Sequence, residues 1–368
     1  MKIICQKNIL FNAINVAAKA VSSKRNIEIM ECILLIAKNN ELTLVANDAE
    51  LGIETVIDQD IQILEAGMIA VNARTLSNII HKMPDGEIEI SSDEQTYISF
   101  KSGDILFDKI LAHSADTFSL LPDVSYSYTF KLSCFTLKEM IRQTIFSVAG
   151  EDANKMMTGE LFEIKDDHLR IVSLDGHRVS LKKTALKEHN DDKKVIIPSR
   201  TLNELTKIIG DDPEEEVFIH FSDNHIMFKY DKTKILSLLI DGDYYEIDAL
   251  MTTDYSTRVV VNRQSLLDCI DRSTLLIREA DRKPVIFDIK DQVMSLRLQS
   301  DIGSMNEPLP VEKEGDDLMI AFNPQFFLDA LRVIDDEEVS LYMTNPKYPC
   351  FIRDKEDNYI YLILPVNF

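Results

Sequence analysis

The sequence predicts an α+β protein built from three tandem copies of one domain, each with two helices packed on antiparallel sheet. A turn followed by a helix start occurs three times, at residues 71–76 (VNARTL), 197–202 (IPSRTL) and 322–327 (FNPQFF). The lags are 198 − 72 = 126 and 323 − 198 = 125 residues. A repeat of that length is a whole domain, because solenoid units are only about 20–50 residues long. Such a body presents one surface several times.

Each copy opens with a short strand and a helix. The strands are residues 2–5, 128–132 and 258–261. In the helices that follow, apolar residues recur at the i, i+3, i+4, i+7 spacing of a helix with one buried face. These residues are Ile9, Leu10, Ala13, Ile14 and Ala17 in the first copy, Leu137, Met140, Ile141 and Ile145 in the second, and Leu266, Leu267, Ile270 and Leu275 in the third.

A β-hairpin follows each of these helices, because β-rich stretches flank a short polar turn. The hairpins are residues 33–45 with a turn at 39–40, residues 161–173 with a turn at 166–167, and residues 285–298 with a turn at 290–291. A second helix comes next in each copy, at residues 74–82, 200–209 and 324–334, and further strands follow at residues 87–90, 217–221 and 339–343. Turns rich in Asp, Glu and Gly end these second helices.

The domain boundaries fall near residues 122–123 and 252–254, which predicts domains at residues 1–124, 125–252 and 253–368. No low-complexity linker separates them, so we expect the domains to pack rigidly end to end.

Composition is typical of a soluble globular protein, with 45% apolar and 28% charged residues in 368. No apolar run approaches the roughly 18 residues that span a bilayer, and the first residues lack a signal-peptide core. We therefore expect a cytoplasmic protein with no membrane partner.

The five cysteines point to buried packing rather than to chemistry. Their number is odd, none are spaced as CxxC, and Cys5, Cys134 and Cys269 each lie near the start of one copy. We expect small buried hydrophobic residues, with no disulfide framework, no zinc site and no cofactor.

The net charge of −22 taken alone argues against nucleic-acid binding, because proteins that bind phosphate are usually basic. Net charge is an average, however, and a basic stripe can lie within an acidic envelope.

The segment 173–179 (SLDGHRV) carries the most specific resemblance to a known family. Together with residues 146–149 (FSVA), 195–198 (VIIP) and 364–366 (LPV), it resembles the bacterial sliding clamp, the β subunit of DNA polymerase III. The resemblance covers the whole chain and all three repeats in order.

This resemblance implies the DNA clamp fold, in which two chains close head to tail into a homodimer ring around duplex DNA. Helices line the hole and sheets form the outside. The implied function is processivity in DNA replication without catalysis, because the ring tethers polymerases by topology. The implied partners are the alpha subunit of DNA polymerase III, the clamp loader complex, other proteins with a clamp-binding motif, and double-stranded DNA in any sequence.

In this arrangement, basic residues on the inner helices would guide the phosphate backbone without reading sequence. The candidates are Lys24, Arg25, Arg74, Lys82, Arg142, Arg200, Lys207 and Arg278. The same helices carry Glu139, Glu204 and Asp268, so the lining is only partly basic. Each candidate could equally be an ordinary solvated residue of a helix.

The resemblance also implies a pocket for a partner peptide that carries a glutamine and apolar residues. Carried over by position, it would consist of Met157, Leu174, Gly176, His177, Arg178, Val179, Tyr245, Leu250, Pro349, Leu364, Pro365, Val366 and Asn367. An apolar groove with a few polar anchors suits such a peptide.

Four segments depart from the family pattern. Residues 244–246 (YYE) replace an aromatic residue followed by proline, and residues 248–249 (DA) stand where basic residues are common. Asn367 replaces a frequent arginine, and residues 28–30 (EIM) replace Pro-Ile-Leu. The fold should survive these changes, whereas the loss of positive charge should weaken contact with acidic peptide residues.

Ring closure would join Phe107 of one chain to Leu275 and Leu276 of the other. Ordinary core packing is the alternative for these three residues.

Two other classes of function remain open at this point. In an enzyme, Asp175 and His177 could act as a base and its orienting group, although Asp-Gly reads more simply as a tight turn. The sequence has no GxSxG motif or glycine-rich phosphate loop. His220 and His225 lie within or beside a strand with acids nearby, but the sequence offers no convincing third metal ligand. A protein-only scaffold without DNA is the other alternative, and DNA retention that depends on salt would distinguish it.

Overall fold

The computed structural model describes residues 1–22, 27–93, 96–126, 128–150, 154–187, 192–251, 254–278 and 283–368. The chain forms two compact units. The first unit is Met1–Phe135 with Arg200–Leu239, and the second is Thr136–Ser199 with Ile240–Phe368. The middle third of the chain is therefore divided between the two units.

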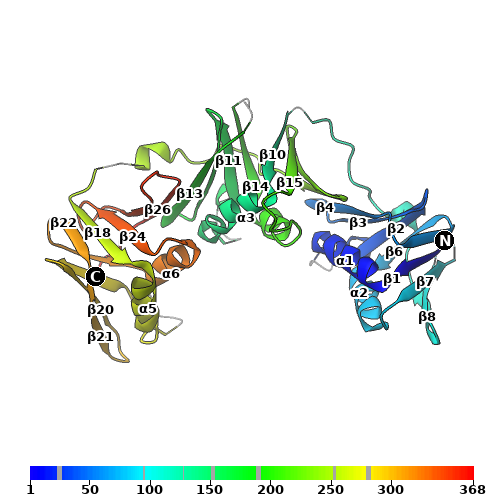
Figure 1. Ribbon diagram of the computed structural model, residues 1–368, viewed down its shortest axis with the longest axis horizontal. Helices are drawn as coiled ribbons and strands as arrows, with labels where there is room; N and C mark the ends of the chain where they lie inside the picture. The colour runs from blue at the N-terminus through cyan, green and yellow to red at the C-terminus, as the bar shows by residue number, and fades with distance from the viewer. Residues whose placement is uncertain are drawn as a thin grey trace. The chain divides into compact units, whose positions relative to one another are not determined.

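The first unit contains two antiparallel sheets (Figure 1). The five-stranded sheet has the order β5 (Ile61–Glu65), β1 (Lys2–Gln6), β7 (Glu87–Ser92), β8 (Tyr97–Ser102) and β9 (Ile105–Leu111). The eight-stranded sheet has the order β10 (Tyr128–Ser133), β15 (Glu216–Phe221), β16 (His225–Tyr230), β17 (Thr233–Leu238), β4 (Leu51–Ile57), β3 (Glu41–Asn47), β2 (Cys32–Lys38) and β6 (Gly67–Asn72). Helices α1 (Lys7–Ala17) and α2 (Ala73–Lys82) pack against each other, and the short 3-10 helices are η1 (Ala18–Ala20), η2 (Glu28–Glu31) and η3 (Ala115–Thr117).

The second unit also contains two antiparallel sheets. The nine-stranded sheet has the order β14 (Lys193–Pro198), β11 (Gly159–Lys165), β12 (His168–Leu174), β13 (Arg178–Ala185), β26 (Tyr359–Ile363), β25 (Cys350–Arg353), β24 (Glu338–Met343), β18 (Thr257–Asn262) and β22 (Glu312–Gly315). The four-stranded sheet has the order β21 (Ser304–Pro310), β20 (Val293–Gln299), β19 (Val285–Lys290) and β23 (Leu318–Phe322). Helices α5 (Arg263–Thr274) and α6 (Pro324–Val333) pack side by side, and the 3-10 helices are η4 (Ile145–Ser147), η5 (Lys155–Thr158) and η6 (Asp248–Leu250).

Two helices cross the border between the units along the chain. Helix α3 (Cys134–Arg142) begins in the first unit and continues in the second, and α4 (Ser199–Leu205) begins with one residue of the second unit.

The repeated segment that marks three copies in the sequence contains helix caps. Asn72 caps α2 by accepting a hydrogen bond from the backbone N–H of Thr75, at 3.1 Å. Asn323 caps α6 by accepting from the N–H of Gln325, at 3.0 Å. An asparagine in this position satisfies an N–H that the helix itself leaves without a partner, typically worth about 1 kcal/mol. Local chemistry therefore explains why these residues recur at the same place in the first and third copies.

The predicted hairpins form, and two of the three turns lie where the sequence predicted them. Asn39 and Asn40, and likewise Asp166 and Asp167, have positive φ between 50° and 63°. Asn and Asp tolerate this left-handed conformation, which two-residue hairpin turns require. The prediction for the third turn was wrong by one residue, because β19 continues through Lys290 and the left-handed residue is Asp291, with φ 50°.

Three predictions about helices were also wrong. Helix α4 ends at Leu205 rather than at residue 209, because the N–H groups of Lys207 and Ile208 bond to carbonyls three residues back. That pattern tightens the last turn into a 3-10 turn. Leu275 does not belong to the buried face of α5. It follows the helix end at Thr274 and is 78% exposed. Ile145 likewise lies in η4, beyond the end of α3.

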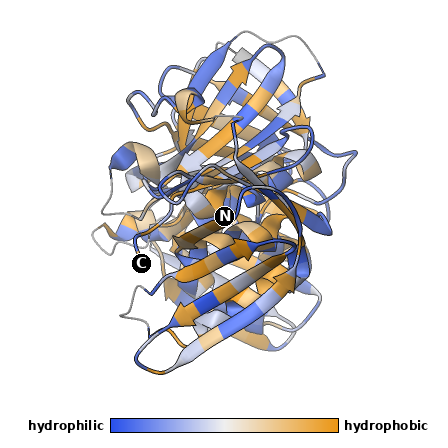
Figure 2. Ribbon diagram, turned by 90° about the vertical axis from the view of Figure 1, so that its left-hand side faces the viewer, coloured by the Kyte–Doolittle hydropathy of each residue, from blue (hydrophilic) through white to orange (hydrophobic). Residues whose placement is uncertain are grey.

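Hydrophobic and hydrophilic residues alternate along many strands, as Figure 2 shows. Strands β1, β8, β20 and β24 each alternate buried with more exposed positions. This period of two gives each sheet one face toward the core and one toward solvent.

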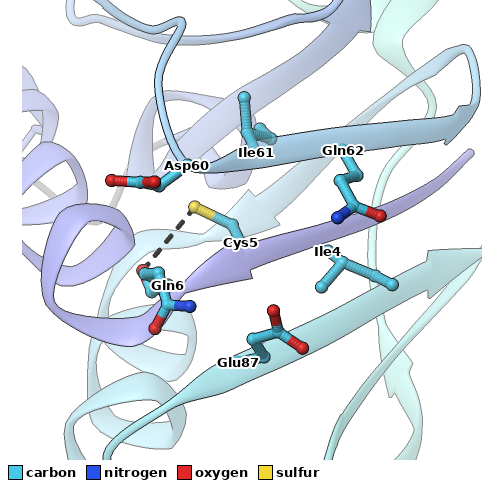
Figure 3. Close-up of a pocket in the computed structure, with 7 residues that line it drawn as sticks. All are labelled: Ile4, Cys5, Gln6, Asp60, Ile61, Gln62 and Glu87. Atoms are coloured by element: carbon cyan, nitrogen blue, oxygen red, sulfur yellow. Dashed lines mark hydrogen bonds between the residues drawn. The ribbon is translucent and has the colours of Figure 1, made fainter.

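All five cysteines are buried, and none of them forms a disulfide. Figure 3 shows Cys5 at a hollow of the first unit, where its thiol donates to the carbonyl of Gln6 at 3.6 Å. Burial raises the pKa of Cys5 and of Cys32 to about 11, and that of Cys269 to about 12. The prediction of small buried residues is therefore confirmed.

Within the described ranges, no group of three or more His, Cys, Asp or Glu side chains could hold a metal ion. No helix among the described residues is both long and apolar enough to span a membrane.

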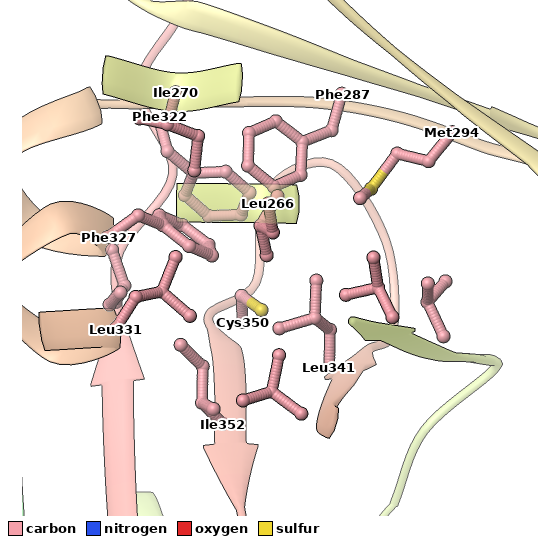
Figure 4. Packing of buried hydrophobic residues seen from close by; sticks show 14 of the residues in the cluster. Leu266, Ile270, Phe287, Met294, Phe322, Phe327, Leu331, Leu341, Cys350 and Ile352 are labelled. Carbon is pink, nitrogen blue, oxygen red and sulfur yellow. The ribbon is translucent and has the colours of Figure 1, made fainter. Parts of the chain in front are cut away.

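The core of the second unit centres on three phenylalanines (Figure 4). Phe287 and Phe322 come from neighbouring strands, and Phe327 comes from α6, with ring centroids 4.9–5.3 Å apart. Tilted rings at this distance add to the stability gained from burial alone. The core anchors the first turn of α6 to the sheets, and that turn borders the site described next.

Candidate functional site

The turn between β12 and β13 is held by its own aspartate. The Asp175 carboxylate accepts hydrogen bonds from the backbone N–H groups of His177 and Arg178, at 3.0 and 3.2 Å. Gly176, between Asp175 and His177, has φ 86°, a left-handed conformation that favours glycine. The His177 ring stacks on Phe326 of α6, with centroids 6.0 Å apart. Asp175 is thus a turn former, which supports the simpler of the two sequence interpretations over a base with its orienting group.

Arg178 ties this turn to two other parts of the second unit. Its Nε donates to Asp175 at 3.0 Å, Nη1 to Asp329 of α6 at 2.6 Å, and Nη2 to the carbonyl of Phe146 at 2.7 Å. The guanidinium also lies over the rings of Phe326 and Phe146, at 4.6 and 5.5 Å from their centroids. The side chain is only 11% exposed. These contacts make Arg178 a fixed cross-link rather than a free cation.

The C-terminal segment lies along the same turn. The N–H of Leu364 donates to the carbonyl of His177 at 2.9 Å, and the N–H of Val366 donates to the carbonyl of Ala321 at 2.8 Å. These two bonds hold an extended segment beside the turn and beside the residues that lead into α6. Leu364 and Val366 are each 37% exposed, so their side chains add apolar surface to the rim.

A separate apolar cluster underlies the turn. Its buried members are Leu161, Val172, Leu174, Val179, Leu181, Ile247, Phe351 and Leu362. Met157 and Tyr244 pack against it from the edge, and Tyr244 donates to the carbonyl of Val172 at 3.4 Å. Tyr245 and Leu250 remain exposed, and the Tyr245 hydroxyl accepts from the Asn154 amide at 3.0 Å. A buried apolar floor and an apolar rim give a surface suited to an extended peptide.

Family comparisons match the chain from end to end. The family models of the three DNA polymerase III beta subunit domains match in order along the chain. The N-terminal domain matches residues 1–121, the central domain 131–246 and the C-terminal domain 249–367. The chain belongs to this family, the sliding clamps. Its fold is therefore three copies of one clamp domain, as the sequence predicted.

Individual relatives agree over the whole length. The beta sliding clamp of Staphylococcus epidermidis is 30% identical, and that of Staphylococcus aureus is 31% identical, each over 100% of this chain and 99% of the relative. Among solved structures, a putative DNA polymerase III beta subunit from Eubacterium rectale is 51% identical with a TM-score of 0.96. The DNA polymerase sliding clamp from Bacillus subtilis is 30% identical, also with a TM-score of 0.96. Each structural match covers 100% of this chain and 99% of the other.

All thirteen residues predicted for the clamp's partner pocket lie in the second unit. The structure brings Met157, Leu174 and Val179 into one cluster and joins Leu364 to His177. Pro349 lies half-buried just before β25, whose Phe351 belongs to that cluster. Gly176 and Asn367 are exposed, and Pro365 is half-buried. A role for these residues in peptide binding stays a prediction.

The sequence interpretation missed Phe326, Asp329 and Tyr244. The Phe326 ring stacks on His177 and makes a cation–π contact with the Arg178 guanidinium. Asp329 forms an ion pair with the same guanidinium. A signal for Phe326 was present, because the third copy of the repeated segment places it in the first turn of α6. No local pattern indicates that Asp329 pairs with a residue about 150 positions earlier.

The departure at Asp248 is compensated within the clamp. Asp248 accepts a hydrogen bond from Arg170 at 2.5 Å, and this contact lowers the pKa of the carboxyl. Arg170 also forms an ion pair with Glu163, and the same carboxylate pairs with Lys194 Nζ at 2.9 Å. Asp248 therefore fastens η6 to β12 instead of offering a free charge.

The predicted DNA-facing residues differ in how free they are. Lys24 and Arg25 lie outside the described residues. Arg200 pairs with Asp48 at 2.5 Å, and Lys207 pairs with Glu204 at 2.8 Å. Arg142 pairs with Glu139 and Asp335, and Glu139 is the main cause of its raised pKa. Arg74, Lys82 and Arg278 are exposed. Contact of any of these residues with DNA stays a prediction.

The residues predicted to join two clamps lie at surfaces. Phe107 is on β9, the edge strand of the five-stranded sheet, and is 36% exposed. Its neighbours Ile105, Leu106 and Leu111 are exposed as well. Leu275 is exposed and Leu276 is half-buried. Ordinary core packing therefore does not account for Phe107 or Leu275. An apolar edge strand suits pairing with another chain.

Proposed function

We propose that this clamp acts in DNA replication as a homodimer ring that encircles duplex DNA. The ring tethers the replicative polymerase and other replication and repair proteins, and the clamp performs no catalysis itself. The observation that carries this proposal is the match of all three beta subunit domains, in order, along the whole chain. We place it in the cytoplasm, with domains at residues 1–124, 125–252 and 253–368.

Head-to-tail closure is supported by the exposed apolar residues of β9, which include Phe107, and by Leu275 after α5. The first-domain surface of one clamp would meet the third-domain surface of the other, and two such contacts close the ring.

Topological rather than adhesive binding to DNA is supported by charge. A net charge of −22 repels the phosphate backbone, so side-on association is weak. Three of the candidate basic residues, Arg142, Arg200 and Lys207, already have carboxylate partners, which reduces the number of cations available to grip DNA tightly. A ring that is held by being closed needs no such grip.

The test is retention on a nicked circular plasmid in the presence of the cognate clamp loader and ATP. We expect the clamp to co-elute with the circle and to be released when the circle is cut. Retention on both forms would mean direct gripping and would contradict the topological proposal. Loss from both forms, with the loader ATPase active and stimulated, would favour a protein-only scaffold.

The second prediction concerns the C-terminal segment. Deleting residues 364–368 should abolish docking of a short peptide with glutamine and apolar residues, because Leu364 and Val366 supply part of the rim. The protein should remain a dimer, since the deletion removes none of the residues proposed for the dimer contact, Phe107, Leu275 and Leu276. Fluorescence anisotropy measures docking and light scattering measures mass. A peptide with its apolar residues replaced by alanine is the control, and undiminished affinity after the deletion would contradict the assignment of the pocket.

A further inference from the structure

We propose that the partner pocket prefers peptides whose apolar residues are flanked by lysine or arginine over peptides flanked by aspartate or glutamate. The inference rests on the proposed peptide-binding function and adds the charge of the partner to it. It follows from a comparison of which charged groups around the pocket are engaged and which are free.

The cations beside the pocket already have partners. The Arg178 guanidinium donates to two carboxylates and one carbonyl and lies over two aromatic rings. An acidic peptide residue could reach this group only by breaking an ion pair that is largely buried. Arg170 is held by Glu163 and Asp248, and Lys194 is held by Glu163. Each of these three cations is therefore already paired with at least one carboxylate.

The segment 241–248, called here the wall, carries carboxylates without ion-pair partners among the described residues. Within residues 241–248, Tyr244 and Ile247 pack into the apolar cluster, while Asp241, Asp243 and Glu246 are exposed. In the part of the chain that the structure describes, these three carboxylates form no ion pair. Glu246 lies near Lys194, whose pKa is raised first by its hydrogen bond to Glu163 and less by Glu246.

The wall belongs to the pocket rather than to a distant surface. The Tyr245 hydroxyl in this wall accepts a hydrogen bond from the Asn154 amide, and the Met156 sulfur lies against Gly242. Helix η5 therefore packs on this segment. Lys155 of η5 is exposed and supplies one positive charge to set against three negative ones. The net local charge is negative, and a basic flank on the peptide is complementary to it.

The expected effect is moderate, because these carboxylates are exposed to solvent and screened by salt. Exposed charge pairs typically contribute a few tenths to about 1 kcal/mol each. A peptide with basic flanks should therefore bind roughly fivefold more tightly than the same peptide with acidic flanks, and the ratio should shrink as salt is raised.

The experiment compares two labelled peptides with one core of glutamine, leucine and phenylalanine, flanked by lysines in one and by glutamates in the other. Anisotropy titrations of the full-length clamp at low and high salt give the affinity ratio. The variant Asp241→Asn/Asp243→Asn/Glu246→Gln should bring the ratio close to one. The matched control Asp301→Asn/Glu312→Gln/Asp316→Asn removes three exposed carboxylates elsewhere in the second unit and should leave the ratio unchanged.

Equal or tighter binding of the acidic peptide to the unmodified clamp would overturn the charge preference and leave the pocket itself in place. A ratio that both variants lower equally would also overturn it, because the effect would then come from net charge. Failure of both peptides to bind would overturn the proposed pocket along with the preference.

Discussion

Replacing Arg178 by alanine is expected to destabilise the second unit by about 2–4 kcal/mol and to weaken peptide docking at the same time. The substitution leaves Asp175 and Asp329 without their shared cation, and both carboxylates are less than a quarter exposed. It also removes the donor to the Phe146 carbonyl and the contact with the Phe326 ring. Because the β12–β13 turn, η4 and α6 are joined through this one group, the turn should lose its fixed position under the C-terminal segment.

Hydrogen exchange is the suitable measurement, because proteins of several domains do not unfold in a single step. The amides of α6 and those of Leu364 and Val366 should exchange faster in Arg178→Ala. Arg332→Ala is the matched control, since Arg332 pairs with Asp271 at 3.3 Å with both side chains more than half exposed. Such a pair is worth at most about 1 kcal/mol. Equal effects of the two substitutions would contradict the cross-linking role of Arg178.

Arg178→Lys separates charge from geometry. Lysine keeps the positive charge but cannot donate in the fork that reaches Asp175, Asp329 and a carbonyl together. We expect the α6 amides of Arg178→Lys to lose less protection from hydrogen exchange than those of Arg178→Ala. The peptide affinity of Arg178→Lys should lie closer to that of the unmodified clamp than the affinity of Arg178→Ala does.

The second large effect concerns Glu160, a fully buried glutamate on β11. Neither carboxyl oxygen has a hydrogen-bond partner among the described residues. Burial raises the pKa of Glu160 well above its usual value, and the nearby Thr144 hydroxyl offsets only part of this shift. The Thr144 proton is directed at the carbonyl of Met140, at 2.9 Å. The folded clamp therefore holds Glu160 in its protonated form at pH values where the unfolded chain has already ionised it.

A raised pKa in the folded state has a definite consequence for stability. Protonated Glu160 makes its full contribution to the free energy of unfolding at pH values below the pKa of the carboxyl in the unfolded chain. That contribution is lost as the pH rises toward the higher pKa of the carboxyl in the folded clamp. Across that window the free energy of unfolding should fall by up to about 1.4 kcal/mol per pH unit. Glutamine has no proton to lose, so Glu160→Gln should become more stable than the unmodified clamp as the pH is raised from about 4.5 toward neutral.

The measurement is the Tm of Glu160→Gln and of the unmodified clamp across this pH range. The result is the difference between the two Tm values at each pH. Glu312→Gln on β22 is the control, because this exposed carboxylate should give a flat difference. A flat difference for Glu160→Gln would mean that water or a local rearrangement solvates the buried carboxyl and would contradict the prediction.

The parts of the fold that were predictable from sequence depend on neighbours along the chain. Asn72 and Asn323 mark helix starts because each binds an N–H two or three residues ahead. The asparagines at 39–40 mark a turn because they tolerate positive φ. The end of α4 and the exposure of Leu275 were not predictable in this way, since they depend on how the last helical turn tightens.

The candidate site shows the same division more sharply. The sequence pointed to Arg178 through a local motif, but its partners Asp329 and Phe146 lie at distances along the chain that no periodicity encodes. Likewise, Arg200 fits a basic helix face by pattern, whereas the structure pairs it with Asp48 of the β3–β4 turn. Pair formation of this kind depends on tertiary packing, so the free charge of a surface cannot be counted from the sequence.

The buried cysteines bear on how movement of the clamp along DNA could be observed. Burial raises the pKa of Cys5, Cys32, Cys269 and Cys350, and each of these thiols is at most 1% exposed. Maleimide dyes react with accessible thiolates, so these positions should stay unlabelled near neutral pH. A cysteine introduced at an exposed position such as Asp301 would then carry a single fluorophore, and its diffusion could be followed without first removing the native thiols.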